Sequence, residues 1–337
     1  MSTEKRKRRR RYSGRNPKHF SEKYKELAPE RYADDVASVV ASGKTPAGMH
    51  RPIMVAEILE LLAPQPGEFA VDCTLGYGGH AVALLSAIHP GGRLLALDLD
   101  PLELSKTEAR LRSLGFGPDI FTARRTNFAG LSRILSEPAD IILADLGLSS
   151  MQLDNPERGF TYKYDGPLDL RMNPQRGQPA SALLSTIDEP ALAALLMENA
   201  DEPLADRLAS AILQARVLTT AQLAKTVRHA GGDEDCVRRV FQALRIAVND
   251  EFGALDALLQ TLPLCLKTGG RVAILTFHSG EDRRVKKSFQ DGERSGTYSQ
   301  IAREVVRATP EERRANPRSR SAKLRWARRG SIPQEQS

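Results

Sequence analysis

The sequence contains few cysteines and no long apolar segment. Its three cysteines, Cys73, Cys236 and Cys265, are spaced too widely for a disulfide framework or a zinc site. No apolar run approaches the roughly 20 residues of a membrane-spanning helix, and the N-terminus has no signal-peptide core. We therefore expect a cytoplasmic protein whose cysteines are buried, reduced thiols.

Several catalytic patterns are absent as well. The chain has no P-loop, no Ser-His-Asp arrangement and no group of residues with metal-ligand spacing. His50 and His80 could suggest a metal, but isolated histidines are more often structural residues or substrate contacts than metal ligands. We expect no metal cofactor.

Positive charge is concentrated at the two ends of the chain. Residues 1–20 hold nine Lys or Arg and one acid, while residues 303–329 hold ten Lys or Arg and three acids. Basic ends favour a polyanionic partner, because phosphate contacts dominate binding to nucleic acid. We expect residues 1–45 to form a basic extension, disordered in part, and both ends to bind RNA.

The most informative motif joins a glycine-rich turn to two acidic residues. The segment VDCTLGYGGH (71–80) takes a short apolar strand through Asp72 into a turn containing Gly78 and Gly79, and a second apolar strand ends at Asp98. This order is typical of a nucleotide-type cofactor site in an open α/β sheet. Asp98 is placed to accept hydrogen bonds from ribose hydroxyls.

The acid before the turn favours one cofactor over another. The glycine spacing is G-x-G-G rather than the G-x-G-x-x-G of dinucleotide sites. A carboxylate at Asp72 would repel the pyrophosphate of NAD but suits S-adenosylmethionine (SAM), which carries a sulfonium and an amino group. We favour SAM. An NAD-dependent oxidoreductase is the weakest alternative, because no hydride-transfer residues can be identified.

Alternating strands and helices predict an α/β fold with a doubly wound parallel sheet. After the fourth strand, periodic helical segments predict a helical insertion of about ninety residues. We therefore expect a Rossmann-like, SAM-binding domain at 46–150 and 237–330, and a helical subdomain at 151–236 that acts as a lid or in substrate recognition. The predicted strands are Phe69–Cys73, Arg93–Leu97, Ile120–Ala123, Ile141–Ala144 and Arg271–Thr276, with a final edge strand within 319–328.

The residues that follow two of these strands are candidates for chemistry. Asp145 follows the fourth strand and should face the cofactor crevice, because ligands bind at the carboxyl ends of parallel strands. The lone pair of an exocyclic amine such as N4 of cytosine is delocalised into the ring. An acceptor that holds its N–H can turn that lone pair toward the methyl group. His278, after the last parallel strand, could accept a proton, contact RNA or fix its own loop.

The long loop after the fourth strand combines aromatic and basic residues. Phe160 and Tyr162 could stack on a base, while Arg158 and Arg171 could hold phosphates. Long loops of this composition are usually functional or disordered. We expect these four side chains to contact RNA.

The motifs together resemble the RsmH (MraW) family of bacterial 16S ribosomal RNA cytosine-N4 methyltransferases. The resemblance covers about residues 50–329. It rests on six colinear segments: 72–80, 98–101, 145–154, 157–169, 241–249 and 277–279, with a further match at 316–325. Departures from the family pattern, such as Gly280 in place of a leucine, lie mainly in the insertion and in the loop after the last parallel strand.

The resemblance implies roles for individual residues. The cofactor would be SAM, and the acceptor a cytidine N4 in the decoding region of the small ribosomal subunit. Gly78, Gly79 and His80 would line the SAM tail. Asp98 would hold the ribose and Phe128 would lie near the adenine. Asp145 and Gln152 would complete the pocket.

Two alternative functions remain open from the sequence. One is a methyltransferase with another acceptor, such as DNA or protein. The other is a SAM-binding, RNA-binding assembly factor without catalysis. The sequence also leaves open whether the protein is a monomer or a homodimer.

Overall fold

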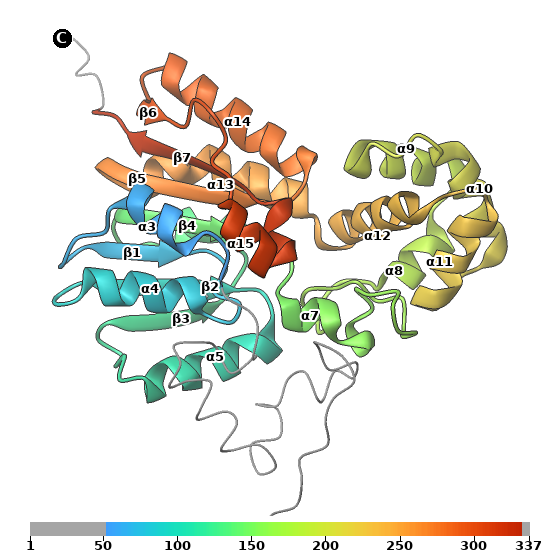
Figure 1. The fold of residues 1–337 in the computed structure, drawn as a ribbon, viewed down its shortest axis with the longest axis horizontal. Coiled ribbons are helices and arrows are strands. Elements are labelled where there is room, and N and C mark those ends of the chain that lie inside the picture. Colours follow the sequence, from blue (N-terminus) through green and yellow to red (C-terminus); the bar gives the residue numbers. More distant parts are fainter. Residues whose placement is uncertain (1–51, 332–337) are drawn as a thin grey trace, which may run out of the picture. The chain divides into compact units, whose positions relative to one another are not determined.

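The computed structural model describes residues 52–331 of the 337-residue chain (Figure 1). The basic extension predicted over 1–45 lies outside the described residues. Within them, no helix is both long enough and apolar enough to cross a membrane. Cys73, Cys236 and Cys265 are all buried and form no disulfide.

A seven-stranded sheet with the order β3-β2-β1-β4-β5-β7-β6 forms the centre of the fold. Strands β1 to β5 are mutually parallel. This confirms the expected α/β, Rossmann-like class. The strands are β1 (Phe69–Asp72), β2 (Arg93–Asp98), β3 (Phe121–Arg125), β4 (Ala139–Asp145), β5 (Leu266–Thr276), β6 (Tyr298–Ile301) and β7 (Lys323–Arg329).

Strand β7 reverses the direction of the sheet. It runs antiparallel to both of its neighbours, β5 and β6. The five strands of the predicted parallel sheet are confirmed, whereas the final strand, which was expected at the edge, lies in the interior and β6 forms the edge. Alternation of polar and apolar residues indicates an extended segment, but it carries no information about direction or pairing partner.

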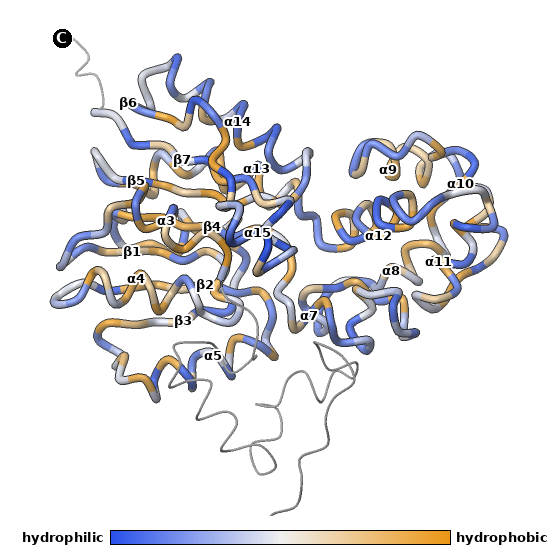
Figure 2. The backbone as a smooth tube through the Cα atoms, in the orientation of Figure 1, coloured by the Kyte–Doolittle hydropathy of each residue, from blue (hydrophilic) through white to orange (hydrophobic). Residues whose placement is uncertain are grey.

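Helices cover both faces of the sheet. Because both faces are buried, the central strands are almost continuously apolar (Figure 2). Along β1, Ala70 faces the group formed by α3, α4 and α5, and Val71 faces the group formed by α6, α13 and α14. These helices are α3 (Val55–Leu62), α4 (Gly79–Ile88), α5 (Pro101–Ser113), α6 (Leu131–Ile134), α13 (Glu251–Cys265) and α14 (Ser279–Arg294).

The helices inserted between β4 and β5 have a hydrophobic core of their own (Figure 1). That core extends from Phe160 to Leu244, so it includes α12 as well as the helices before it. We call residues 151–249 the helical subdomain. Its main helices are α8 (Ala180–Thr186), α9 (Glu189–Ala200), α10 (Ala205–Ala215), α11 (Thr220–His229) and α12 (Glu234–Asn249).

The chain returns from the helical subdomain to the sheet through a break at Asp250. The spacing of apolar residues predicts one long helix over 237–262, but Asp250 has a left-handed backbone with φ of 48° and separates α12 from α13. Asp250 is also the residue that ends α12, where its N–H donates to carbonyls of the last turn. The pattern of apolar residues continues across this break, so periodicity alone does not reveal it.

Short helices surround the carboxyl edge of the parallel strands. They are η2 (Phe128–Gly130), α7 (Ser150–Asp154), η3 (Pro156–Arg158), α15 (Pro310–Ala315) and η4 (Pro317–Arg320). Helix α7 begins with a capping box in which Ser149 and Gln152 exchange hydrogen bonds. Arg318 of η4 pairs with Asp154 of α7 at 3.0 Å, which fastens the C-terminal segment to this edge.

Candidate active site at the carboxyl edge of the sheet

The glycine-rich turn follows β1 and leads into α4. Gly78 has φ of 72°, and a Cβ there would lie 2.9 Å from both Leu111 and Thr107 of α5. A Cβ on Gly79 would lie 2.7 Å from Pro52 Cγ. Both positions therefore require glycine, because neighbouring segments approach the turn too closely for any side chain.

Asp98, at the end of β2, is held against this turn. Its Oδ2 accepts a hydrogen bond from Gly76 N at 2.7 Å, and its Oδ1 accepts one from Asp100 N at 2.8 Å. Burial raises the pKa of Asp98 to about 6, although the two backbone hydrogen bonds act in the opposite direction. The carboxylate keeps lone pairs free for ribose hydroxyls.

Asp72, at the end of β1, lies beside the same turn. Its Oδ1 accepts a hydrogen bond from Thr74 N at 3.0 Å, while its Oδ2 is buried without a hydrogen-bond partner among the described residues. Burial raises its pKa to about 6, and the nearby His80 opposes this shift. An unsatisfied buried carboxylate oxygen indicates a place for a ligand that donates hydrogen bonds or carries positive charge.

Asp145, at the end of β4, contributes the third carboxylate. Its main-chain N–H donates to Thr74 Oγ1 at 2.7 Å, so Thr74 links the ends of β1 and β4. Its Oδ1 is buried without a hydrogen-bond partner in the described part of the chain. Burial, followed by the charge of Glu281, raises the pKa of Asp145 to about 7.

His80 faces Asp145 from the first turn of α4. Its Nε2 lies 2.9 Å from the carbonyl oxygen of Ile53, and this nitrogen must carry the proton because a carbonyl only accepts. Its Nδ1 lies 3.5 Å from Asp145 Oδ2. Burial lowers the pKa of His80. A neutral His80 therefore presents an acceptor nitrogen to a carboxyl group that takes up a proton unusually easily.

We call Asp72, Asp98 and Asp145 the anionic pocket. They end three adjacent parallel strands, and the charges of Asp98 and Asp145 both act on the pKa of Asp72. Over residues 52–331, no Lys or Arg pairs with any of the three. Such a pocket fits a cationic ligand, and SAM has both the positive charge and the ribose that these carboxylates can hold.

Phe128 and Gln152 are linked to the anionic pocket only through neighbouring residues. Phe128 begins η2, two residues after Thr126, whose N–H donates to the carbonyl of Asp98. Gln152 Nε2 donates to Asp100 Oδ2 at 2.8 Å, and its Oε1 accepts from Ser149 N. Gln152 therefore reaches the pocket through Asp100.

Asp100 is a further candidate site residue, which the sequence motifs do not single out. It is 1% exposed and caps the N-terminus of α5. The pair Asp100-Pro101 is a recognisable helix-start signal. That signal predicts the cap, but it does not predict the buried contacts that Asp100 makes with Gln152 and Arg158.

His278 precedes α14 and lies beside Glu281. Its Nε2 is 3.1 Å from Glu281 Oε1, and Glu281 Oε2 accepts from Phe277 N at 2.8 Å. Burial acts to raise the pKa of Glu281, but the contacts with His278 and Phe277 outweigh it and the pKa is lowered. Phe252 packs against this loop, and a Cβ on Gly280 would lie 2.6 Å from its ring.

Glu251, His278 and Glu281 also bring three metal-ligating atoms within 4.8 Å of one another. However, Arg245 donates to both carboxylate oxygens of Glu251, at 2.8 and 2.9 Å. A guanidinium therefore occupies the carboxylate that a metal ion would need, and the group is built as an ion-pair network.

Of the four side chains in the loop after β4 that were expected to contact RNA, two are buried and the other two have partners within the protein. Phe160 is 5% exposed and belongs to the core of the helical subdomain, and Arg158 is 8% exposed. Tyr162 packs against Phe241 with ring centroids 5.3 Å apart. Arg171 pairs with Asp169 at 2.7 Å. The loop closes on itself instead of presenting these side chains to solvent.

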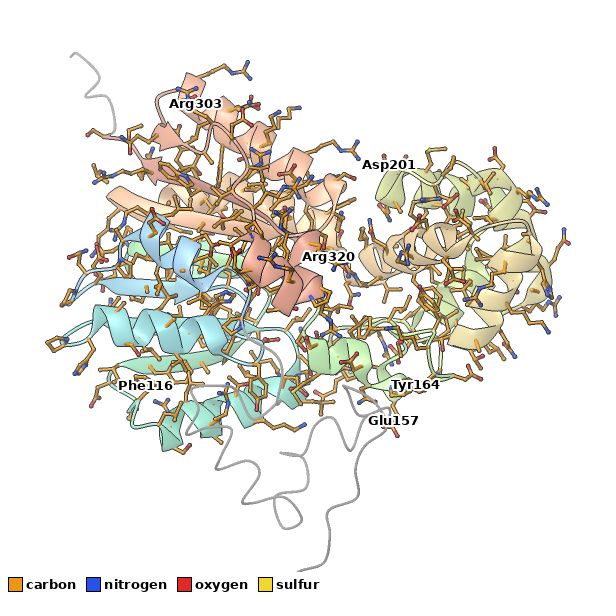
Figure 3. All side chains as sticks on the ribbon, viewed as in Figure 1. Phe116, Glu157, Tyr164, Asp201, Arg303 and Arg320 are labelled. Atoms are coloured by element: carbon orange, nitrogen blue, oxygen red, sulfur yellow. The ribbon has the colours of Figure 1, made fainter. Side chains whose placement is uncertain are left out.

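Much of the basic C-terminal segment is also occupied within the protein. Arg325 and Lys323 both pair with Asp282, at 2.6 and 3.0 Å. In contrast, the side chains of Arg313 and Arg320 are exposed, and neither side chain has a hydrogen-bond or ion-pair partner among the described residues. Arg320 is labelled in Figure 3. These two arginines are the better candidates for phosphate contacts.

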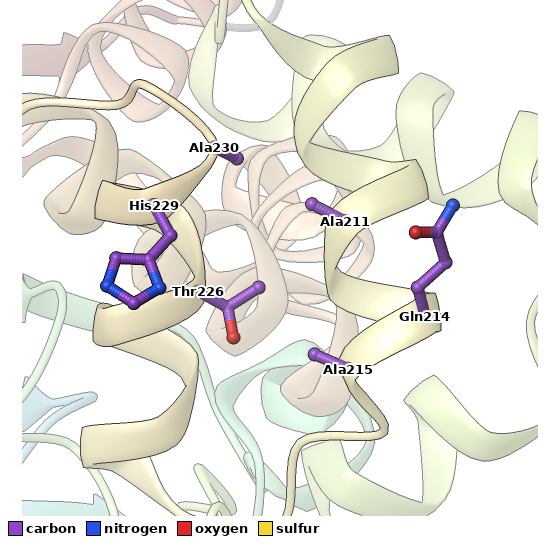
Figure 4. Close-up of a pocket in the computed structure, with 6 residues that line it drawn as sticks. All are labelled: Ala211, Gln214, Ala215, Thr226, His229 and Ala230. Carbon is purple, nitrogen blue, oxygen red and sulfur yellow. The ribbon is translucent and has the colours of Figure 1, made fainter.

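A separate groove of about 400 Å³ lies between α10 and α11 (Figure 4). It is lined mainly by small side chains, including Ala211, Ala215 and Ala230, together with His229. No predicted site residue lines it, so the groove is separate from the candidate active site.

Comparison with known proteins decides the family. The sequence matches the MraW methylase family over residues 47–330. The chain belongs to this family. It is 51% identical, over 96% of its length and 98% of the relative's, to the ribosomal RNA small subunit methyltransferase H 2 of Alkaliphilus metalliredigens. It is 48% identical, over 95% and 92%, to the ribosomal RNA small subunit methyltransferase H 1 of Lachnoclostridium phytofermentans. The resemblance inferred from the motifs is confirmed.

Proposed function

We propose that this protein transfers the methyl group of SAM to N4 of one cytidine in 16S ribosomal RNA, acting on the small ribosomal subunit in the cytoplasm. Membership of the MraW methylase family supports a SAM-dependent methyltransferase of small-subunit ribosomal RNA. The observation that carries the chemistry is the anionic pocket, in which Asp145 presents a buried, unsatisfied oxygen.

The residues of the glycine-rich turn and the anionic pocket would hold the cofactor. Asp98 would accept hydrogen bonds from the ribose, and Asp72 would face the positive charge. Gly78, Gly79 and His80 would line the amino-acid tail. Phe128 would lie beside the adenine. When bound, SAM supplies an electrophilic methyl carbon on a sulfonium centre.

Asp145 would act on the amine of the target base. Its Oδ1 has no hydrogen-bond partner in the described structure, so it is available to accept an N–H of the cytosine amine. Accepting that hydrogen bond turns the nitrogen lone pair toward the methyl carbon and stabilises the charge that develops on nitrogen. His80 Nδ1, 3.5 Å from Asp145 Oδ2, is placed to share the released proton.

His278 would contact the target nucleotide. Glu281 lies beside Nε2 and favours the tautomer that carries its proton there, which leaves Nδ1 as an acceptor. The target cytidine has to leave its stack to reach this edge of the sheet. The helical subdomain would recognise its surroundings, while Arg313, Arg320 and residues 1–45 would contact phosphates.

The test is methyl transfer to a defined nucleotide. Purified protein is incubated with labelled SAM and small ribosomal subunits from cells that lack this gene, and nuclease digestion with mass spectrometry locates the label. Label on N4 of a single cytidine supports the proposal. SAM binding without label on any RNA would favour a binding role in subunit assembly, and label on another atom or molecule would refute the proposed acceptor.

A further inference from the structure

Asp100 connects the cofactor pocket to the loop that follows β4. Its N–H donates to Asp98 Oδ1 at 2.8 Å. Its Oδ2 accepts from Gln152 Nε2 at 2.8 Å and from Arg158 Nη1 at 2.7 Å. Asp100 and Arg158 are 1% and 8% exposed, so this ion pair is shielded from water. The geometry of a buried charged hydrogen bond is tightly constrained, because a misplaced partner leaves a charge unsatisfied.

Arg158 has a second set of partners farther along the same loop. Its Nη2 donates to the carbonyl oxygen of Met172 at 2.8 Å and to that of Arg171 at 3.2 Å. One guanidinium therefore holds Asp100 through one nitrogen and the loop through another. Because the N–H groups of a guanidinium form a rigid planar fork, fixing one partner also fixes the direction of the other.

The loop is fastened in turn to the last residue of α12. Asn249 Oδ1 accepts from Met172 N at 2.7 Å, and its Nδ2 donates to Leu170 O and Arg245 O, both at 2.8 Å. The next residue, Asp250, is the break between α12 and α13. The contacts therefore run from the cofactor pocket to the point where the helical subdomain rejoins the sheet.

We propose that Arg158 is a positioning residue for methyl transfer, which holds the helical subdomain in register with the cofactor pocket. This inference rests on the proposed function. In-line transfer requires the amine and the methyl carbon to meet within about 3–3.5 Å, and a displacement of about 1 Å can lower the rate about a hundredfold. Arg158 itself contacts neither reactant. It acts through Asp100 on the cofactor side and through the loop on the substrate side.

A second, exposed bridge between the same two parts of the protein provides a matched control. Arg283 of α14 pairs with Asp201, which follows α9, at 2.9 Å, and the two side chains are 62% and 56% exposed. Exposed pairs of this kind are weak and are screened by salt. The two bridges therefore use the same chemical groups, but only the pair of Arg158 with Asp100 is shielded from water.

The experiment compares Arg158→Lys with Arg283→Lys in the full-length protein. A lysine at 158 keeps a positive charge near Asp100, but one ammonium group cannot bond Asp100 and the two loop carbonyls with the geometry of the fork. Isothermal titration measures the Kd for SAM, and labelled SAM with undermethylated small subunits gives kcat and the KM for the subunit. Thermal unfolding verifies that each variant is folded.

For Arg158→Lys we expect kcat to fall about a hundredfold, with a Kd for SAM close to that of the wild type. Arg283→Lys should change neither value. Asn249→Ala, which removes the other end of the connection, should lower kcat in the same selective way. If Arg158→Lys does not fold, the kcat of Asn249→Ala tests the positioning role in its place.

Other results would overturn the inference. An unchanged kcat in folded Arg158→Lys and Asn249→Ala proteins would remove the positioning role. Losses of SAM affinity as large as the loss of kcat would assign Arg158 to cofactor binding alone. A wild-type protein that binds SAM but labels no subunit would refute the proposed function, and the positioning role would fall with it.

Discussion

Replacing Asp145 with asparagine should stabilise the protein while it removes activity. Burial raises the pKa of Asp145 from 3.8 to about 7. The unfolded chain therefore loses this proton near pH 4, whereas the folded protein keeps it until about pH 7. Between these values the folded state binds more protons than the unfolded state, so this group makes stability fall as pH rises.

The size of the effect follows from the same pKa. A tenfold change in a proton equilibrium corresponds to about 1.4 kcal/mol, so the ionised carboxylate lowers the free energy of unfolding at pH 8 by as much as about 4 kcal/mol. The Asp145 side chain is 28% exposed, and water offsets part of that cost. We expect Asp145→Asn to raise the free energy of unfolding at pH 8 by about 2 kcal/mol. At pH 5 the gain should be less than about half as large, because pH 5 lies only about one unit above the unfolded pKa of 3.8.

Chemical denaturation at pH 8 and pH 5 measures this change. Asp140→Asn is the control on the same strand, because Asp140 accepts from Phe69 N and pairs with Lys267, and its pKa is lowered despite partial burial. Asp140→Asn should therefore lower the free energy of unfolding at pH 8. Methyl transfer by Asp145→Asn should fall about a hundredfold or more. An Asp145→Asn protein that is less stable than wild type at pH 8, or equally affected at both pH values, would refute the reasoning.

Three further predictions concern the turn, the pocket and the RNA surface. Gly78→Ala should lower the free energy of unfolding by about 2–4 kcal/mol, because backbone strain adds to overpacking against α5. Gly115→Ala, with φ of 93° and no atom within 4 Å of its Cβ, should show the strain alone in the same denaturation assay. The affinity for SAM, measured by titration calorimetry between pH 8 and pH 5, should weaken below about pH 6, where Asp72 and Asp98 take up protons. An affinity that is constant over this range would contradict the assignment of the cation to these carboxylates. Changing Arg313 and Arg320 to glutamine should weaken RNA binding and make its salt dependence shallower, by a slope of about 0.7–0.9 for each lost phosphate contact, without changing SAM affinity. An unchanged slope would place the phosphate contacts elsewhere.

Most of the secondary structure could be predicted from local patterns, and so could the place where the candidate site residues come together. Residues 69–79 contain a strand, the acid that ends it and the glycine turn that follows. All three could be predicted from this short segment, because the conformation of the turn and the charge of the acid depend on the residues present there. Asp98 and Asp145 could be placed at one edge because parallel strands end on the same side of a sheet. The resemblance to the family followed from the same segments.

The tertiary structure decided which side chains remain available for binding. Phe160, Tyr162 and Arg158 looked like RNA contacts in an exposed loop, but they are buried or packed within the helical subdomain. Of the basic C-terminal segment, Arg325 is satisfied by Asp282, whereas Arg320 remains exposed. An arginine has the same local sequence signal whether it faces solvent or an acid more than forty residues away.

Local patterns also could not predict which strands pair or in which direction they run. Strand β7 alternates polar and apolar residues as expected, yet its place between β5 and β6 depends on the path of the preceding chain. The break at Asp250 depends on how α12 and α13 pack against different cores. Sequence determined local conformation and the chemistry of the pocket, because both arise from neighbouring residues. The tertiary structure alone decided burial, strand partners and the connection through Arg158, because these depend on residues that are distant along the chain.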